Sequence, residues 1–171
     1  MSLSPAEESI LRQRAQRLAR PLPALAPQTP ALSLLRFTLG SESYALESKY
    51  VLEVVSTKQL LPLPGVPSFV KGILSVQGQI WSIIDIRDFF AIAKDGPNHH
   101  SRAILVSTPY LRWGLLADAH LEILYPKNLD PPPGVNEHIP RNFIKGTLEQ
   151  TVVVLDIVNF SADPRLLVRE T

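Results

Sequence analysis

The ionisable side chains that could do chemistry are few in this sequence, and most are spaced for structural roles. Asp85 and Asp88 are three residues apart near a predicted strand-to-helix junction. A carboxylate pair can serve acid–base catalysis, but Asp85 better suits a helix N-cap, where a carboxylate offsets unpaired backbone amides. The adjacent His99 and His100 lie in a polar loop without HExxH-type spacing. We therefore predict no metal site and no catalytic role for these residues.

Acidic and imidazole side chains occupy every second position at Asp118, His120 and Glu122. The remaining enzyme hypothesis is that a pocket brings these three side chains together. Their spacing suits the ends of a strand turn equally well, and it names no reaction. The sequence has no GxSxG elbow, no GxGxxG or GxxxxGKS/T loop and no cysteine. Thiolate and zinc–thiolate chemistry are thereby excluded, and the common enzyme classes lack their motifs. We expect a protein that is not an enzyme and that has no cofactor.

Charge and hydropathy argue against two further classes of protein. The 171 residues carry 17 Lys and Arg against 16 Asp and Glu, a net charge of +1, so no bulk positive field attracts nucleic acid. No run of about 18 apolar residues predicts a transmembrane helix, and the N-terminus lacks the basic-then-apolar order of a signal peptide. We expect a cytoplasmic protein that binds no nucleic acid and does not insert into the membrane.

Residues 1–20 predict an amphipathic helix. Ser4 suits the N-cap, Pro5 the first helical position, and Glu7 completes a capping box. Whether the helix is solvated, docks on the chain's own folded domain or docks on a partner is left open by its short apolar stripe. Residues 21–31 hold four prolines and no charged residue, which predicts a semi-rigid linker. At the other end, residues 163–171 are predicted to be a tail.

From residue 32 onward the apolar period changes to two, as in strands. The pattern predicts a hairpin over residues 35–46 with its turn at residues 40–43, and a second hairpin that joins two runs through Gly78. The remaining predicted strands follow at short intervals, at residues 50–56, 103–107, 112–117, 121–125 and 151–155. Short strands without a βαβ repeat favour a mainly β fold of small barrels or a sandwich.

The run of residues 50–56 is predicted to open on a helical turn and to continue as a strand. A period of two would place Val51 and Glu53 on one face and Leu52 and Val54 on the other. A single acidic residue on a strand usually marks the face that is exposed to solvent, so Glu53 alone does not define a site.

The densest apolar stretch, residues 63–90, contains no nucleophile, no ligand cluster and no phosphate-binding loop. Such a stretch favours a surface that binds over a site that reacts. Trp81 and Trp113 lie in apolar strand runs and are predicted to belong to the core or to an interface.

Four separated blocks of the sequence resemble the CheW family of chemotaxis coupling proteins, in the family's order and at compatible spacing. They are RFTLGSESYALESKYVLEVV, LPLPGVPSFVKGILSVQGQIWSIIDIRDFF, AILVSTPYLRWGLLADAHLEIL and TVVVLDIVNF. The resemblance implies that residues 32–162 form one domain of two packed five-stranded SH3-like β-barrels with short helices. It also implies a noncatalytic adaptor without a cofactor.

The same resemblance implies the partners and the binding residues. Members of the family bind a CheA-type histidine kinase through that kinase's regulatory domain, and they bind the hairpin tip of methyl-accepting chemoreceptors; other CheW-like domains are a further expected partner. The protein is then expected in the cytoplasm, at receptor arrays on the inner face of the membrane. Positions that match family motifs are predicted to bind protein: Val51, Glu53, Val54, Gln77, Gly78, Asp85, Arg87, Gly114, Leu116 and Asp118.

One predicted binding position departs from the family pattern. The family typically has NLRG where this chain has SVQG, so Gln77 stands in place of an arginine associated with partner contacts. A neutral amide cannot form the charge-assisted bidentate bonds of a guanidinium. The departure supports an alternative hypothesis, in which the chain is an array-packing or specialised scaffold without the standard receptor or kinase contact.

Overall fold

The computed structural model describes residues 4–18, 32–95, 100–132 and 138–166. The chain divides into two compact units, Met1–Pro30 and Ala31–Thr171. The predicted linker at residues 21–31 lies outside the described residues. Each unit is described by itself below.

The first unit contains one helix, α1 (Pro5–Leu18), which begins at the predicted capping box. The backbone amide of Ser4 donates to Glu7 Oε2 at 2.9 Å, and the amide of Glu7 donates to Ser4 Oγ at 3.4 Å. These reciprocal bonds satisfy two amides that a helix start otherwise leaves unpaired. The predicted helix is confirmed, and its apolar Ile10 and Leu11 are each about half exposed, at 52% and 51%.

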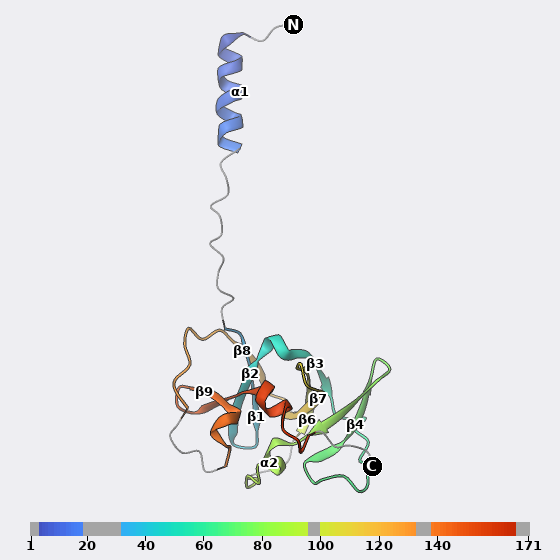
Figure 1. Cartoon of the computed structure of the whole chain (residues 1–171). Coiled ribbons are helices and arrows are strands. Elements are labelled where there is room, and N and C mark those ends of the chain that lie inside the picture. The colour runs from blue at the N-terminus through green and yellow to red at the C-terminus, as the bar shows by residue number, and fades with distance from the viewer. Residues whose placement is uncertain (1–3, 19–31, 96–99, 133–137, 167–171) are drawn as a thin grey trace. The chain divides into compact units, whose positions relative to one another are not determined.

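The second unit is built from two five-stranded sheets (Figure 1). The first sheet has the order β8-β1-β2-β10-β9. Its strands are β1 (Leu34–Leu39), β2 (Glu42–Glu47), β8 (Leu121–Leu124), β9 (Ile144–Leu148) and β10 (Val152–Leu155). Its pairings are antiparallel except for β2 with β10, which run parallel. Four buried residues form this sheet's own core cluster: Leu34, Ala45, Val152 and Val154.

The second sheet has the order β3-β6-β7-β5-β4, again with one parallel pair, β5 with β7. Its strands are β3 (Val51–Ser56), β4 (Val70–Val76), β5 (Gln79–Ile84), β6 (His100–Ser107) and β7 (Arg112–Asp118). It encloses a separate cluster made of Leu74, Trp81, Ile83, Ala103, Leu105 and Leu116. Two sheets that each wrap a small cluster confirm the predicted mainly β fold of two five-stranded barrels.

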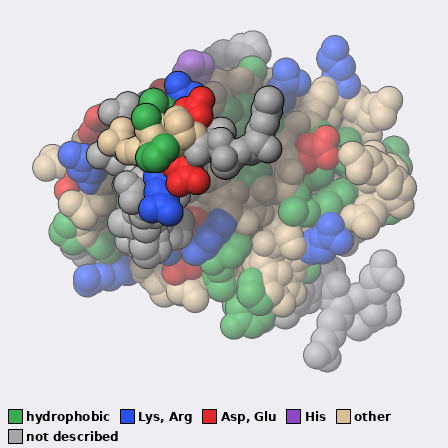
Figure 2. Space-filling model, turned by 90° about the horizontal axis from the view of Figure 1, so that it is seen from above, with side chains coloured by type: hydrophobic (Ala, Val, Ile, Leu, Met, Phe, Trp, Pro, Cys, Tyr) green, Lys and Arg blue, Asp and Glu red, His purple; other side chains and the backbone are tan. Residues whose placement is uncertain are grey.

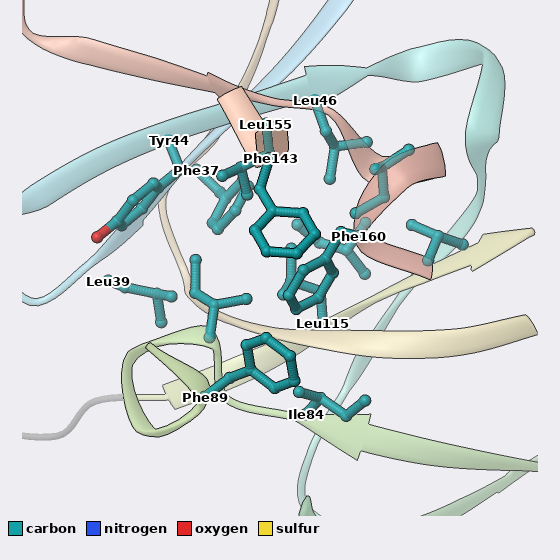
Figure 3. Packing of buried hydrophobic residues seen from close by; sticks show 14 of the residues in the cluster. Phe37, Leu39, Tyr44, Leu46, Ile84, Phe89, Leu115, Phe143, Leu155 and Phe160 are labelled. Carbon is teal, nitrogen blue, oxygen red and sulfur yellow. The ribbon is translucent and has the colours of Figure 1, made fainter. Parts of the chain in front are cut away.

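A larger aromatic core is shared by both sheets and lies around Phe160 (Figure 3). The rings of Phe89 and Phe143 pack edge-on against Phe160 at 4.7 and 5.8 Å between centroids, and Trp113 lies 5.1 Å away. The indole of Trp113 donates to Ser161 Oγ at 2.9 Å, so its buried N–H is satisfied. These side chains come from short helices and one strand: α2 (Ile86–Phe89), η2 (Arg141–Phe143), α3 (Ile157–Ser161) and β7.

Strand β9 was not predicted from the sequence. Its IKGTL pattern has a lysine and a glycine where a strand predictor expects apolar residues. The glycine is required by tertiary packing, because a Cβ on Gly146 would lie 2.8 Å from the Asp130 carbonyl oxygen. The first hairpin turn is also tighter than predicted, since Glu42 and Ser43 already pair within β2 and only two residues turn.

The prediction that Val51 and Glu53 share a face of β3 is wrong. The register of β3 against β6 shifts between these two residues, which is the mark of a β-bulge. Val51 packs on the shared core, whereas Leu52, Glu53 and Val54 are all exposed. A bulge interrupts the alternation of faces, so three neighbouring side chains of β3 become available to solvent. The predicted helical turn before the strand is confirmed as η1 (Ser48–Tyr50).

The surface carries charges of both signs. On the face drawn in Figure 2, acidic and basic side chains are interspersed with hydrophobic and uncharged ones. Within the described parts of the chain, no helix has the length and apolar character needed to cross a membrane.

Candidate protein-binding surface

A groove of about 310 Å³ lies on the second sheet, between β3 and the β4–β5 hairpin. We call it the β3–β5 groove. Its lining residues are Leu52, Glu53, Val76, Gln77, Gln79, Trp81, Leu105 and Arg112. Two of the residues predicted to bind protein, Glu53 and Gln77, are therefore brought together although they lie on different strands. Trp81 and Leu105 are nearly buried and belong to the core cluster of this sheet.

The β3 wall of the groove presents an acid beside an apolar side chain. Leu52 is 54% exposed and its neighbour Val54 is 37% exposed. Within the described residues, the Glu53 carboxylate has no hydrogen bond and no ion pair. The bulge before Glu53 produces this arrangement, because a regular strand would turn one of the three side chains toward the core.

Glu47 anchors the chain just before β3 begins. Its carboxylate accepts hydrogen bonds from Lys145 of β9 and Lys49 of η1, with 2.7 Å between Glu47 Oε2 and Lys49 Nζ. Burial raises the pKa of Glu47, but the hydrogen bonds and charges of the two lysines outweigh burial, so the pKa lies below its usual range. The hydrogen bond between Glu47 of β2 and Lys145 of β9 thus holds the end of the first sheet in place. The chain continues from this end into η1 and β3.

The opposite wall is the tip of the β4–β5 hairpin, which extends away from the rest of the domain (Figure 1). Gln77 and Gly78 form a two-residue turn, with φ values of +50° and +78°. Positive φ at both positions is the requirement of a type I′ turn, whose twist matches that of the paired strands. The side chain of Gln77 is exposed on this tip, and the neighbouring Ile80 is 66% exposed.

Arg112 closes the groove from β7. Its guanidinium carbon lies 4.9 Å from the centroid of the Trp81 ring, within the range of a cation–π contact. Trp81 is 5% exposed and Trp113 is 1% exposed, which confirms that both tryptophans belong to the core. The sequence did not single out Arg112, because β7 and β3 are brought to one groove only by the sheet.

Asp85 and Arg87, both predicted to bind protein, lie inside the domain. Asp85 is the N-cap of α2: its Oδ1 accepts from the Arg87 amide at 2.9 Å, and its Oδ2 lies 3.0 Å from Arg87 Nη2. Asp85 is fully buried and Arg87 is 3% exposed. The buried pair therefore shapes the helix that carries Phe89 into the shared core, and its part in partner binding stays a prediction.

Three further predicted residues lie along β7 and do not line the β3–β5 groove. A Cβ on Gly114 would lie 2.3 Å from Ile83 Cδ1, so the end of that buried side chain would have to shift to accommodate it. Leu116 is 4% exposed and belongs to the core cluster of the second sheet. Asp118 Oδ2 accepts a 2.9 Å hydrogen bond from the Gly40 amide and so braces the β1–β2 turn. Their part in partner binding stays a prediction.

Within the described residues, the acidic side chains that the sequence offered for chemistry contact other groups of the fold. Asp88 is held by Lys71 and by Lys94, the latter at 2.7 Å. The ionic hydrogen bonds of these two lysines outweigh burial and lower the pKa of Asp88. Glu122 faces Arg36 at 3.6 Å, while Asp118 serves the turn described above. In the described ranges there is no group of three His, Asp or Glu residues able to hold a metal ion.

The chain is similar in sequence to several known proteins. Residues 33–164 match the family of the CheW-like domain. The chain is 25% identical over 142 residues to the chemotaxis protein CheW of Treponema pallidum (strain Nichols), a match that covers 78% of this chain and 84% of that protein. It is 29% identical over 106 residues to the protein PilI of Pseudomonas aeruginosa, covering 62% and 60% of the two chains.

A solved structure shares the fold. The scaffolding protein TtCheW from Thermoanaerobacter tengcongensis superposes with a TM-score of 0.67 at 28% sequence identity, over 78% of this chain and 88% of that one. The two-sheet architecture is therefore the one found in this relative.

Proposed function

Since the chain belongs to the CheW family, we propose that it is a noncatalytic adaptor that couples methyl-accepting chemoreceptors to a CheA-type histidine kinase in a cytoplasmic array. The observation that carries the proposal is the β3–β5 groove, in which an unpaired acid lies beside the exposed apolar side chain of Leu52. Anchors of this kind, with apolar area at the centre and polar groups at the rim, are typical of protein interfaces.

The kinase is the proposed occupant of the groove. Leu52 in the groove, and Val54 and Ile80 on the two strands that flank it, offer exposed apolar area to a barrel of the kinase's regulatory domain. Glu53 supplies a charge that no described residue of the chain neutralises. Apolar area contributes affinity, whereas an unpaired carboxylate selects partners that offer a cation.

The chemoreceptor is proposed to bind elsewhere, beside β7. Support comes from the sequence blocks around Gly114, Leu116 and Asp118, which resemble the family's receptor-binding motif. Gly114 and Leu116 are buried, so their side chains do not reach a receptor. We propose that they hold β7 in the shape that receptor binding needs, and that exposed side chains beside them make the contact.

The test of the kinase contact is calorimetric titration of the full chain with the regulatory domain of its cognate kinase. Binding at or below tens of micromolar is expected. Leu52→Ser should weaken it about five- to tenfold, because roughly half of a leucine side chain, worth about 1 kcal/mol, would be buried by the partner. Ile123→Ser is the matched control, since Ile123 is 47% exposed on the first sheet and outside the groove. Undetectable binding of the wild-type chain at that concentration would refute the proposal.

A second candidate function is a scaffold that packs with other CheW-like domains and has lost the standard receptor or kinase contact. The observation that favours it is Gln77, which places a neutral amide at the hairpin tip where the family typically has arginine. Gln77→Arg separates the two functions. A gain in kinase or receptor affinity of tenfold or more from a weakly binding wild type would support the packing scaffold, and little change from a tight wild type would support the adaptor.

A further inference from the structure

Arg112 is a positively charged residue whose side chain contacts the Trp81 ring. No acidic side chain among the described residues neutralises its charge. Arg112 is the first residue of β7 and its side chain is exposed. A long arginine side chain normally loses rotamer freedom when it binds. Here the flat face of Trp81 already limits that freedom.

The contact with Trp81 leaves the hydrogen-bonding groups of the guanidinium free, since no hydrogen bond of the Arg112 side chain is found among the described residues. A guanidinium carries five N–H donors in the plane of the group. Those donors match the two oxygens of a carboxylate. The groove therefore presents a cation that is oriented before binding, which lowers the entropy lost on association.

Glu53 lines the same groove and is likewise without an ionic partner among the described residues. The groove thus offers one cation and one anion that are both available, with the amides of Gln77 and Gln79 on its β4–β5 side. Such a pattern selects a partner with the reciprocal charges. A partner with only basic or only acidic groups would leave one of the two charges desolvated and unpaired.

We propose that Arg112 is the specificity-determining cation of the β3–β5 groove and binds a carboxylate on the kinase's regulatory domain. This inference rests on the proposed adaptor function and deepens it. Gln77 at the hairpin tip carries no charge, and Arg112 on β7 supplies a positive charge instead. Because both residues line one groove, a partner bound in that groove would meet a cation at either position.

The test is calorimetric titration of the regulatory domain with the full-length wild type, Arg112→Gln and Arg112→Lys. Arg112→Gln should weaken binding about tenfold or more, as expected for a lost hydrogen-bonded charge. Arg112→Lys should recover only part of the loss, because an ammonium keeps the charge but lacks the planar fork. Raising the salt concentration should weaken the wild type more than Arg112→Gln, since salt screens the charge that only the wild type uses.

Two further variants complete the experiment. Arg141→Gln removes an equal charge from an exposed arginine of η2, outside the groove, and should leave the affinity within twofold. Gln77→Arg in the Arg112→Gln background should restore most of the affinity, because the charge returns to the groove on its other wall. Tryptophan fluorescence of each variant reports whether the Trp81 environment and the fold are kept.

The outcomes separate this inference from the proposed function. A wild type that binds, with Arg112→Gln within twofold of it, would overturn the role of Arg112 and leave the adaptor function standing. A wild type that does not bind would overturn both. Equal losses in Arg112→Gln and Arg141→Gln would also overturn the inference, because they would show an effect of net charge alone.

Discussion

Removing the Asp85 side chain should cost this domain much of its stability. Asp85 caps α2 through the Arg87 amide and neutralises the Arg87 guanidinium, with Arg87 Nε at 3.2 Å and Nη2 at 3.0 Å. Asp85→Ala therefore removes an N-cap, worth about 1 kcal/mol, and takes away the carboxylate that pairs with the buried Arg87 guanidinium, a loss of about 3–5 kcal/mol. Because the two losses share the same oxygen atoms, we expect a total of about 4 kcal/mol.

That magnitude is measurable in a domain of this size. A loss of about 4 kcal/mol corresponds to a Tm lower by about 8–16 °C, and urea titration gives the free energy of unfolding directly. Asp156→Ala is the matched control: Asp156 is the N-cap of α3 and accepts from the Asn159 amide at 3.0 Å, without a buried arginine beside it. It should cost only about 1 kcal/mol.

A double variant tests whether the buried pair is the cause. Asp85→Asn with Arg87→Met keeps a capping oxygen and replaces the guanidinium by an apolar side chain of similar length. It should be more stable than Asp85→Ala, because the buried guanidinium is removed together with its carboxylate partner. The reasoning is refuted if Asp85→Ala and Asp156→Ala cost the same, or if the double variant is the least stable of the set.

Three further predictions concern the groove and its supports. Gly114→Ala should destabilise the domain by about 1–3 kcal/mol in urea titration, because its Cβ would meet Ile83 Cδ1 at 2.3 Å; an unchanged urea midpoint would contradict the packing described for β7. Gln77→Asn should stabilise the domain by about 1 kcal/mol, since asparagine tolerates the positive φ of the hairpin turn better than glutamine does, whereas Gln79→Asn, on the adjacent strand, should not. The pKa of Glu47 is lowered from 4.5 in the folded state, so its contribution is present above that pH and is lost as pH falls through the lower folded value. Glu47→Gln should accordingly flatten the loss of Tm between about pH 5 and pH 3, and an equally steep loss would show that other carboxylates dominate.

The elements predicted correctly from the sequence are those with local signals. The capping box of α1 involves residues three apart, and the second hairpin is marked by the Gln77–Gly78 turn itself. Asp85 was also interpreted correctly as an N-cap. In each case the residues that cause the structure are neighbours in the chain, so the pattern and the cause coincide.

The features that were missed depend on distant contacts. Strand β9 is a strand because it pairs with β10 and with Asp130, and its glycine is required by that approach. Arg112 precedes Trp113 in the chain, but it stacks on Trp81 of another strand. A bulge in β3, invisible as a pattern of residue types, turned a predicted alternation of faces into a run of three exposed side chains.

The predicted binding residues divide in the same way. Motif matching selects positions that a family keeps together, without distinguishing a side chain that touches a partner from one that holds the backbone for it. Glu53 and Gln77 line the groove, whereas Arg87 and Leu116 are buried. Burial is decided by both sheets together, which is why sequence spacing alone did not separate the two groups.

The strand order has a consequence for how the protein is made. All five strands of the second sheet come from one continuous segment, residues 51–118, whereas the first sheet joins β1 and β2 to β8, β9 and β10 from the far end of the chain. During synthesis from the N-terminus, the sheet that carries the groove can pair completely while β1 and β2 still wait for partners. Since domains fold as their segments emerge, a ribosome stalled beyond β7 should display a partly folded chain with the groove-bearing sheet formed and two β-strand edges open. The parallel pairing of β2 with β10 then becomes a late step of assembly, because β10 is the last strand of the domain to be synthesised.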